Sequence, residues 1–234
     1  MRREREAANR RYAGFTAGVL FSVLALSMAV WALRPADLDA ATLCPVNRPL
    51  AGHTVVIVDR TDRWTQAMGA ALTQLIENAQ RDTGKYEKFS IVALDAERSV
   101  HPLFSVCNPG EPTFWSDLYR GRRFTTRDFE QRFVGAAERV IAQVREPSEA
   151  QSSPIVEYVH RWLGSDDFNE IVRHRRLILV SDMRQNSSLY SIYSSDGGQL
   201  SDVVERQFGA AASGVTFDVY FVAHGHDYNV TEDE

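Results

Sequence analysis

The sequence lacks the motifs by which α/β proteins hold nucleotides or activate a serine. No G-x-G-x-x-G and no G-x-x-x-x-G-K-[ST] occurs, so no glycine-rich loop is available to bind a phosphate through backbone N–H groups. The G-x-S-x-G elbow of the α/β-hydrolases is absent as well. A phosphatase of the haloacid-dehalogenase kind would need a second aspartate two residues after Asp59, where this chain has Thr61. These absences exclude the enzyme classes that depend on those motifs.

Lysine is nearly absent too, and no basic stripe is visible. Lys85 and Lys88 are the only lysines, arginine carries the remaining positive charge, and the net charge is -5. Nucleic-acid-binding domains usually show a concentrated positive face. We therefore expect no nucleic-acid partner.

One long apolar run is present at residues 14–33, which contain no charged residue. As a helix they would measure about 30 Å, the thickness of a bilayer's hydrocarbon core. Five arginines precede the run, so the positive-inside rule places residues 1–13 in the cytoplasm as an Arg-rich tail. The alternative is a cleaved signal peptide, but its apolar region is about 7–15 residues long and ends in small residues. The sequence favours an uncleaved transmembrane anchor at a bacterial inner membrane, with the remaining chain in the periplasm.

Only two cysteines occur, Cys44 and Cys107. In an oxidising compartment they could form a disulfide that stabilises the fold by about 3–4 kcal/mol. Two unpaired thiols are the alternative.

Strand-like and helix-like segments alternate after a proline-containing linker at residues 34–52. We expect strands near residues 53–59, 88–96, 102–107, 175–183 and 215–225, and helices near 65–82, 126–144, 155–163 and 200–208. An aromatic, turn-rich insertion is expected at about 100–125. Because the central strands are apolar throughout, the pattern predicts an α/β fold in three layers, with a doubly wound and mostly parallel sheet over residues 53–234.

In such sheets the ligand crevice lies at the carboxyl ends of the strands, where Asp59 and Asp182 would fall. The stretches VVIVDRTDRW, SSPIVEYV and LILVSDM resemble a von Willebrand factor A (VWA) domain with its metal-ion-dependent adhesion site. That resemblance assigns Asp59 and Thr61 to the first two motif positions, Ser153 to the loop threonine and Asp182 to the later aspartate. The CNPG and SDMRQNS segments also look like those of uncharacterised, membrane-anchored bacterial proteins with A-domain-like folds.

The resemblance implies a divalent cation, Mg²⁺ or Mn²⁺, because hard cations prefer oxygen ligands. Arg63 departs from the motif, since it stands where a second hydroxyl is expected and its charge would repel a cation. Arg63 could instead pair with Asp59 or Asp182. These two aspartates could also simply cap loops and helix starts.

Aromatic residues in two segments are candidates for partner binding, namely Phe114, Trp115 and Tyr119 in the insertion and Tyr190 and Tyr193 in residues 187–198. Packing over a sheet edge is the alternative for the insertion. His224 and His226 could bind Zn²⁺ but more simply belong to a surface tail.

The sequence therefore favours a membrane-anchored VWA-like module that binds protein partners in a membrane-bound bacterial assembly. No catalytic motif is found. The alternatives are a metal-dependent hydrolase that uses Asp59 and Asp182 in the periplasm, and a structural subunit with an empty site.

Overall fold

The computed structural model describes residues 2–32, 34, 36–60, 64–94, 102–144, 152–193, 199–208 and 212–222. Four residues of interest, Thr61, Arg63, His224 and His226, lie outside these ranges.

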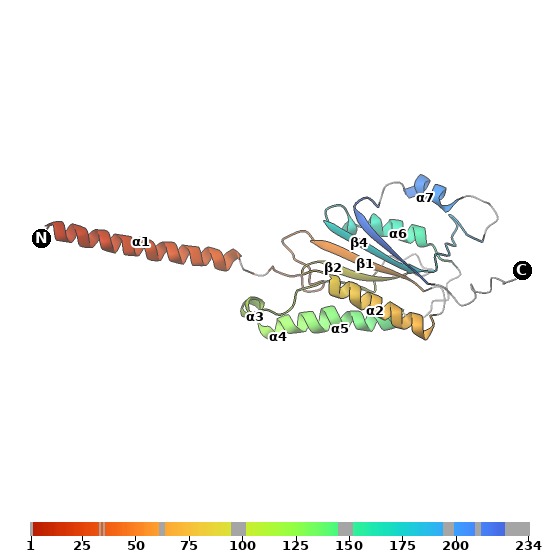
Figure 1. Ribbon diagram of the computed structural model, residues 1–234, viewed down its shortest axis with the longest axis horizontal. Helices are drawn as coiled ribbons and strands as arrows, with labels where there is room; N and C mark the ends of the chain where they lie inside the picture. Colours follow the sequence, from red (N-terminus) through yellow and green to blue (C-terminus); the bar gives the residue numbers. More distant parts are fainter. Residues whose placement is uncertain are drawn as a thin grey trace, which may run out of the picture.

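A five-stranded, mostly parallel sheet forms the centre of the domain (Figure 1). The strands are β1 (Gly52–Asp59), β2 (Lys88–Leu94), β3 (Phe104–Cys107), β4 (His174–Ser181) and β5 (Val215–Phe221). Their order is β3-β2-β1-β4-β5, and only β3 runs antiparallel to its neighbour. The expected α/β class and mostly parallel sheet are thereby confirmed.

Each face of the sheet carries its own hydrophobic core. On one face, alternate residues of β1, β2 and β4 pack against α2 (Gln66–Asp82) and α5 (Gly135–Val144). On the other face, the intervening residues pack against α6 (Ile155–Leu163) and the short 3-10 helix Asp166–Phe168. Both faces of the central strands are therefore buried, which explains why these strands are apolar without alternation. The last helix, α7 (Leu200–Phe208), precedes β5.

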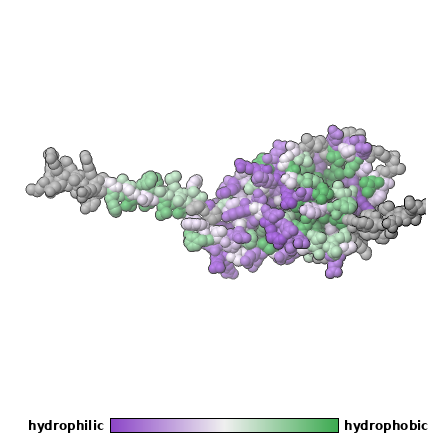
Figure 2. All heavy atoms as spheres, viewed as in Figure 1, coloured by the Kyte–Doolittle hydropathy of each residue, from purple (hydrophilic) through white to green (hydrophobic). Residues whose placement is uncertain are grey.

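An apolar helix, α1 (Arg2–Ala32), projects away from the domain (Figure 1). Its segment Gly14–Ala32 spans 19 residues, has a mean hydropathy of 2.0 and is not buried against the rest of the chain. Figure 2 shows this apolar stretch outside the domain. The helix is long and apolar enough to cross a membrane or to act as a signal anchor.

The segment at residues 34–52, which was predicted as a linker, makes its own contacts with the domain. Cys44 and Cys107 form a disulfide with an S–S distance of 1.99 Å. The backbone N–H of Cys107 donates to the carbonyl of Thr42 (2.8 Å), and that of Ala36 donates to the hydroxyl of Tyr86 (3.3 Å). Leu43 is fully buried. A turn around the disulfide thus gives this segment its own tertiary contacts.

The insertion differs from the expected loop, because it contains α3 (Phe114–Arg120) and α4 (Arg122–Thr126). From α4 the chain continues through the π-helical turn η1 (Arg127–Val134) into α5. Asp128 lies within this π-helical turn. Its buried carboxylate pairs with Arg120 (2.7 Å), Arg132 (3.3 Å) and Arg127 (3.5 Å).

Candidate functional site

The strand order reverses between β1 and β4, because the chain continues from β1 to β2 on one side of this pair and from β4 to β5 on the other side. A doubly wound sheet opens a crevice outside the carboxyl ends of its strands at this point. Asp59 is the last residue of β1, and Asp182 directly follows β4. The structure therefore places both predicted aspartates at the switch point.

The Asp59 carboxylate is buried and accepts two side-chain hydrogen bonds. The hydroxyl of Ser153 donates to Asp59 Oδ2 at 2.9 Å, and that of Ser181 donates to the same oxygen at 3.0 Å. Ser153 was expected here from the resemblance, whereas Ser181 was not assigned a role. Its position, one residue before Asp182 at the end of an apolar strand, is the signal that would have indicated it. Three separate segments thus meet at one carboxylate.

Asp182 is buried and bound by its own loop. Its Oδ1 accepts from the backbone N–H of Arg184 (2.9 Å), and its Oδ2 lies 3.4 Å from the Arg184 Nε. Met183, between them, has a positive φ of 60°, which non-glycine residues rarely adopt. Its N–H donates to Ser181 Oγ at 2.9 Å. The surrounding hydrogen bonds therefore hold Met183 in a left-handed conformation of the kind often found at functional sites.

Gln185 connects the same loop to the start of α6. Its side-chain oxygen accepts from the backbone N–H of Val156 (3.0 Å), a first-turn donor that has no partner within the helix. Its amide donates to Glu157 Oε2 (2.8 Å) and to Ser187 Oγ (3.0 Å), and Ser187 also donates to Glu157. Sequence reasoning missed Gln185 because no spacing rule relates it to a helix 30 residues earlier.

These contacts order the first part of the loop that follows β4, residues 182–193, which we call the β4 loop. Backbone hydrogen bonds join Ser153 to Asn186 at 2.8 and 2.9 Å, and Ile192 N–H to the Gln185 carbonyl at 3.1 Å. Ile192 and Tyr193 are exposed at the end of the described segment, and Met183 is 40% exposed. Tyr190 is half-buried. The β4 loop therefore combines a buried polar base with an exposed apolar surface.

Asp59 and Asp182, two of the predicted cation ligands, both have protein partners. A cation site would need the carboxylate oxygens to face an open position, but Asp59 Oδ2 accepts two hydroxyls and Asp182 is paired with the Arg184 guanidinium. The guanidinium supplies positive charge where a cation would supply it. Among the described residues, no group of three or more His, Cys, Asp and Glu side chains could hold a metal. Thr61 and Arg63 lie outside the described ranges.

The aromatic insertion lies at the opposite end of the sheet from Asp59 and Asp182. β3 runs antiparallel and ends at Cys107, opposite the start of β2 at Lys88. The chain then enters α3, which carries Phe114, Trp115 and Tyr119 beside the end of α1 (Figure 1). One antiparallel strand thus moves the insertion from the crevice to the end of the domain nearest α1.

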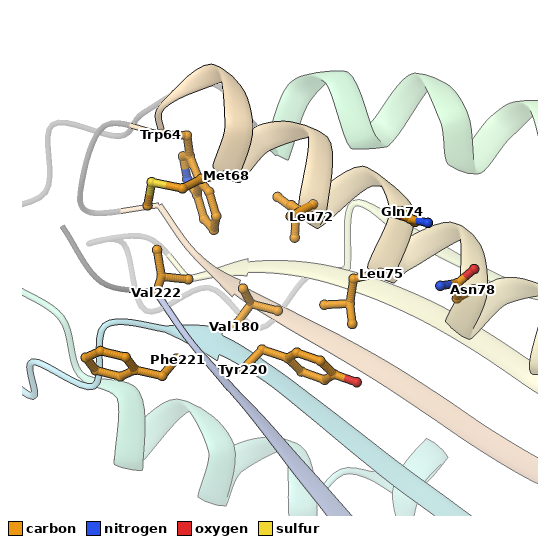
Figure 3. A pocket seen from close by; sticks show the side chains of 11 residues that line it. Trp64, Met68, Leu72, Gln74, Leu75, Asn78, Val180, Tyr220, Phe221 and Val222 are labelled. Carbon is orange, nitrogen blue, oxygen red and sulfur yellow. The ribbon is translucent and has the colours of Figure 1, made fainter. Parts of the chain in front are cut away.

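An apolar groove of about 450 Å³ lies on the face of the sheet that α2 covers, between α2 and the edge strand β5. Figure 3 shows Trp64, Met68 and Leu75 facing Val180 and Tyr220 across it. The groove is adjacent to the crevice residues, because Val222 N–H donates to the Ser181 carbonyl at 3.0 Å. The carboxyl end of the sheet therefore offers both a polar network and an apolar surface.

No family model, curated protein or solved structure matches this chain.

Proposed function

We propose that this chain is a membrane-anchored, VWA-like module that binds a protein partner through the carboxyl end of its sheet. α1 would anchor it in a bacterial inner membrane, with the domain in the periplasm as a subunit of a membrane-bound assembly. The β4 loop, with Tyr190 and Tyr193, would be the main contact surface.

The observation that carries this proposal is the way the β4 loop is held. Asp59, Gln185 and Glu157 fix its base with hydrogen bonds from β1, β4 and α6. Pre-ordering a loop lowers the conformational entropy that binding must overcome. Exposed Ile192 and Tyr193 are the apolar and aromatic side chains that commonly anchor protein interfaces. The carboxyl end also faces away from α1, where a partner has access (Figure 1).

Site-specific photo-crosslinking in cells tests the proposal. A benzophenone amino acid replaces Tyr193 in the full-length chain, and a matched variant carries it at exposed Arg139 on α5. We expect a discrete protein adduct from position 193, absent from position 139 and lost when Ile192→Asp is added. Equal labelling from both positions, or no adduct at 193, would contradict a partner surface at the β4 loop.

A second experiment asks whether Mg²⁺ or Mn²⁺ has a part in that surface. A cation at 100 times its Kd stabilises a fold by about 2.7 kcal/mol, which raises the unfolding midpoint measurably. Because Arg184 occupies the positive position beside Asp182, we expect no shift for the full chain in detergent. A metal-dependent shift that disappears in Asp182→Ala would instead establish an adhesion-type metal site.

A further inference from the structure

One face of α3 is exposed and entirely apolar or aromatic. Phe114 and Leu118 are 74% and 64% exposed, and Trp115 and Tyr119 follow them at the next positions. This i, i+1, i+4, i+5 spacing places all four side chains on one side of the helix. The opposite side faces the domain. Phe124, 52% exposed, continues the apolar face onto α4. We call these five side chains the α3 face.

The inward side of α3 holds the helix in place. Ser116 is buried and forms a capping box with Thr113, which satisfies backbone groups at the start of the helix. The hydroxyl of Thr125 donates to Asp117 at 2.5 Å, and Arg120 pairs with buried Asp128 at 2.7 Å. The α3 face is therefore presented by a fixed support.

The α3 face lies level with the end of the apolar span of α1. The Tyr119 hydroxyl donates to the carbonyl of Val30 at 3.2 Å, and Tyr119 shares a hollow with Leu26 and Trp31. Val30 lies two residues before Ala32, the last residue of the apolar span. It is therefore about 3 Å from the end of the span, measured along the helix axis. This depth corresponds to the boundary between acyl chains and headgroups.

The short connection between α1 and the domain also keeps this end of the domain near the membrane. Ala32 ends α1, and four residues later Ala36 is hydrogen-bonded to Tyr86 of the domain. Four residues span at most about 14 Å when fully extended. The disulfide between Cys44 and Cys107 fixes the segment that follows. The domain therefore cannot move far from the end of α1.

Arginines surround the α3 face. Arg122 and Arg123 are exposed at the start of α4, and the Arg127 guanidinium lies 5.1 Å from the centre of the Phe124 ring. Arginine side chains at a membrane surface place their stems along apolar groups and their charges among phosphates. Tryptophan and tyrosine favour the same interfacial level.

We propose that the α3 face inserts into the headgroup–acyl boundary of the bilayer that α1 spans, and so sets the orientation of the domain on the membrane. This inference rests on the membrane anchoring proposed for α1. The lipid surface is the occupant favoured by the Tyr119–Val30 contact, the short tether and the flanking arginines.

Tryptophan quenching in reconstituted vesicles tests the proposal with the full-length chain. The vesicles contain phosphatidylcholine brominated on the acyl chains near the glycerol backbone, and matched vesicles contain the unbrominated lipid. Trp31→Phe removes the tryptophan of α1. Trp115 is then the exposed tryptophan at this end of the domain, because Trp162, which packs on His53, is buried. We expect brominated lipid to quench the tryptophan fluorescence of Trp31→Phe. The fluorescence of Trp31→Phe/Trp115→Phe should be the same in brominated and unbrominated vesicles.

Charged substitutions supply the matched controls. In the Trp31→Phe background, Phe114→Asp/Leu118→Asp should abolish the quenching, whereas Tyr193→Asp at the far end of the domain should leave it unchanged. Absence of quenching in Trp31→Phe would overturn the proposal and leave the α3 face for a protein partner. The membrane insertion of α1 is measured separately, because brominated lipid should quench the fluorescence of the wild type more than that of Trp31→Phe. If bromolipid quenches neither protein, both the anchor and the α3 face are contradicted.

Discussion

The two ends of the sheet are stabilised by different chemistry. At the end nearest α1, a disulfide joins Cys44 to Cys107, and three arginines surround the buried carboxylate of Asp128. At the carboxyl end, Asp59 is stabilised by the neutral hydroxyls of Ser153 and Ser181. The first end is tied by a disulfide and by a cluster of ion pairs around Asp128, whereas the second depends on hydrogen bonds among loops and has one ion pair, Asp182–Arg184, within the β4 loop.

This difference suggests that the two ends of the sheet have different roles. Covalent and ionic ties suit an end that has to transmit a fixed position from α1 to the sheet. Hydrogen bonds between the ends of strands order a loop without a covalent tie, so the loss of one buried acceptor can loosen the loop while the rest of the domain stays folded. The comparison therefore predicts that the two ends can be disrupted independently.

Removal of the disulfide should have the largest effect. The double substitution Cys44→Ser/Cys107→Ser opens a crosslink between residues 63 positions apart, which should lower the free energy of unfolding by about 4 kcal/mol. Chemical denaturation of the full chain in detergent measures it. The adduct from position 193 should persist under conditions where the variant is folded. Loss of that adduct in folded protein would show that the two ends are coupled.

Asp59→Ala should disrupt the other end with a smaller cost. The buried hydroxyls of Ser153 and Ser181 would lose their acceptor, which lowers the free energy of unfolding by about 1–3 kcal/mol. Limited proteolysis should then cleave the β4 loop faster than in the wild type. Ser153→Ala, which removes one donor and leaves the acceptor, is the control and should cost less. Equal cleavage rates for Asp59→Ala and the wild type would mean that Asp59 does not order the loop.

The smallest effect is expected at Asp39, in the turn beside the disulfide. The backbone N–H of Thr42 donates to its carboxylate at 2.7 Å, and together with the Thr42 hydroxyl and the Ala41 N–H it lowers the pKa of Asp39. Because the folded-state pKa lies below the unfolded one, this stabilisation is present above the unfolded pKa and is lost as the pH falls through the folded pKa.

Asp39→Asn should therefore weaken the dependence of stability on pH only in the acidic range below the ordinary aspartate pKa. Thermal unfolding of the full chain over that range measures the difference from the wild type. Thr42→Val removes the hydroxyl and keeps the backbone donor, so its curve should lie between the two. Parallel curves for Asp39→Asn and the wild type would show that this carboxylate titrates alike in both states.

The sequence predicted most of the elements because their patterns are local. The apolar run at 14–33, the helical spacing in 66–82 and the uninterrupted apolar strands β1 and β4 each carry a periodicity or a length that indicates one structure. α3 was missed because seven residues give too little periodicity to distinguish a helix from a turn. The contacts that the predicted linker at 34–52 makes with the domain were not predicted, because prolines indicate irregular backbone and not whether that backbone is bound.

The candidate site was likewise predicted only in part. Asp59 and Asp182 were placed correctly because strands that run parallel must end at the same edge of a sheet. Arg184 and Gln185 were missed because their partners are set by where a loop folds back, and neither residue belongs to a repeating pattern.

The sequence by itself determined the apolar span, the order of strands and helices, and the carboxylates at the strand ends, since all of these follow from local residue types. Only the tertiary structure decided that Ser153 and Ser181, separated from Asp59 by 94 and 122 positions, donate to one oxygen. It alone decided that the aromatic insertion lies beside α1, through the antiparallel direction of β3. Buried polar groups take whichever partners the folded chain brings within hydrogen-bonding distance, and that selection is not encoded in any single segment.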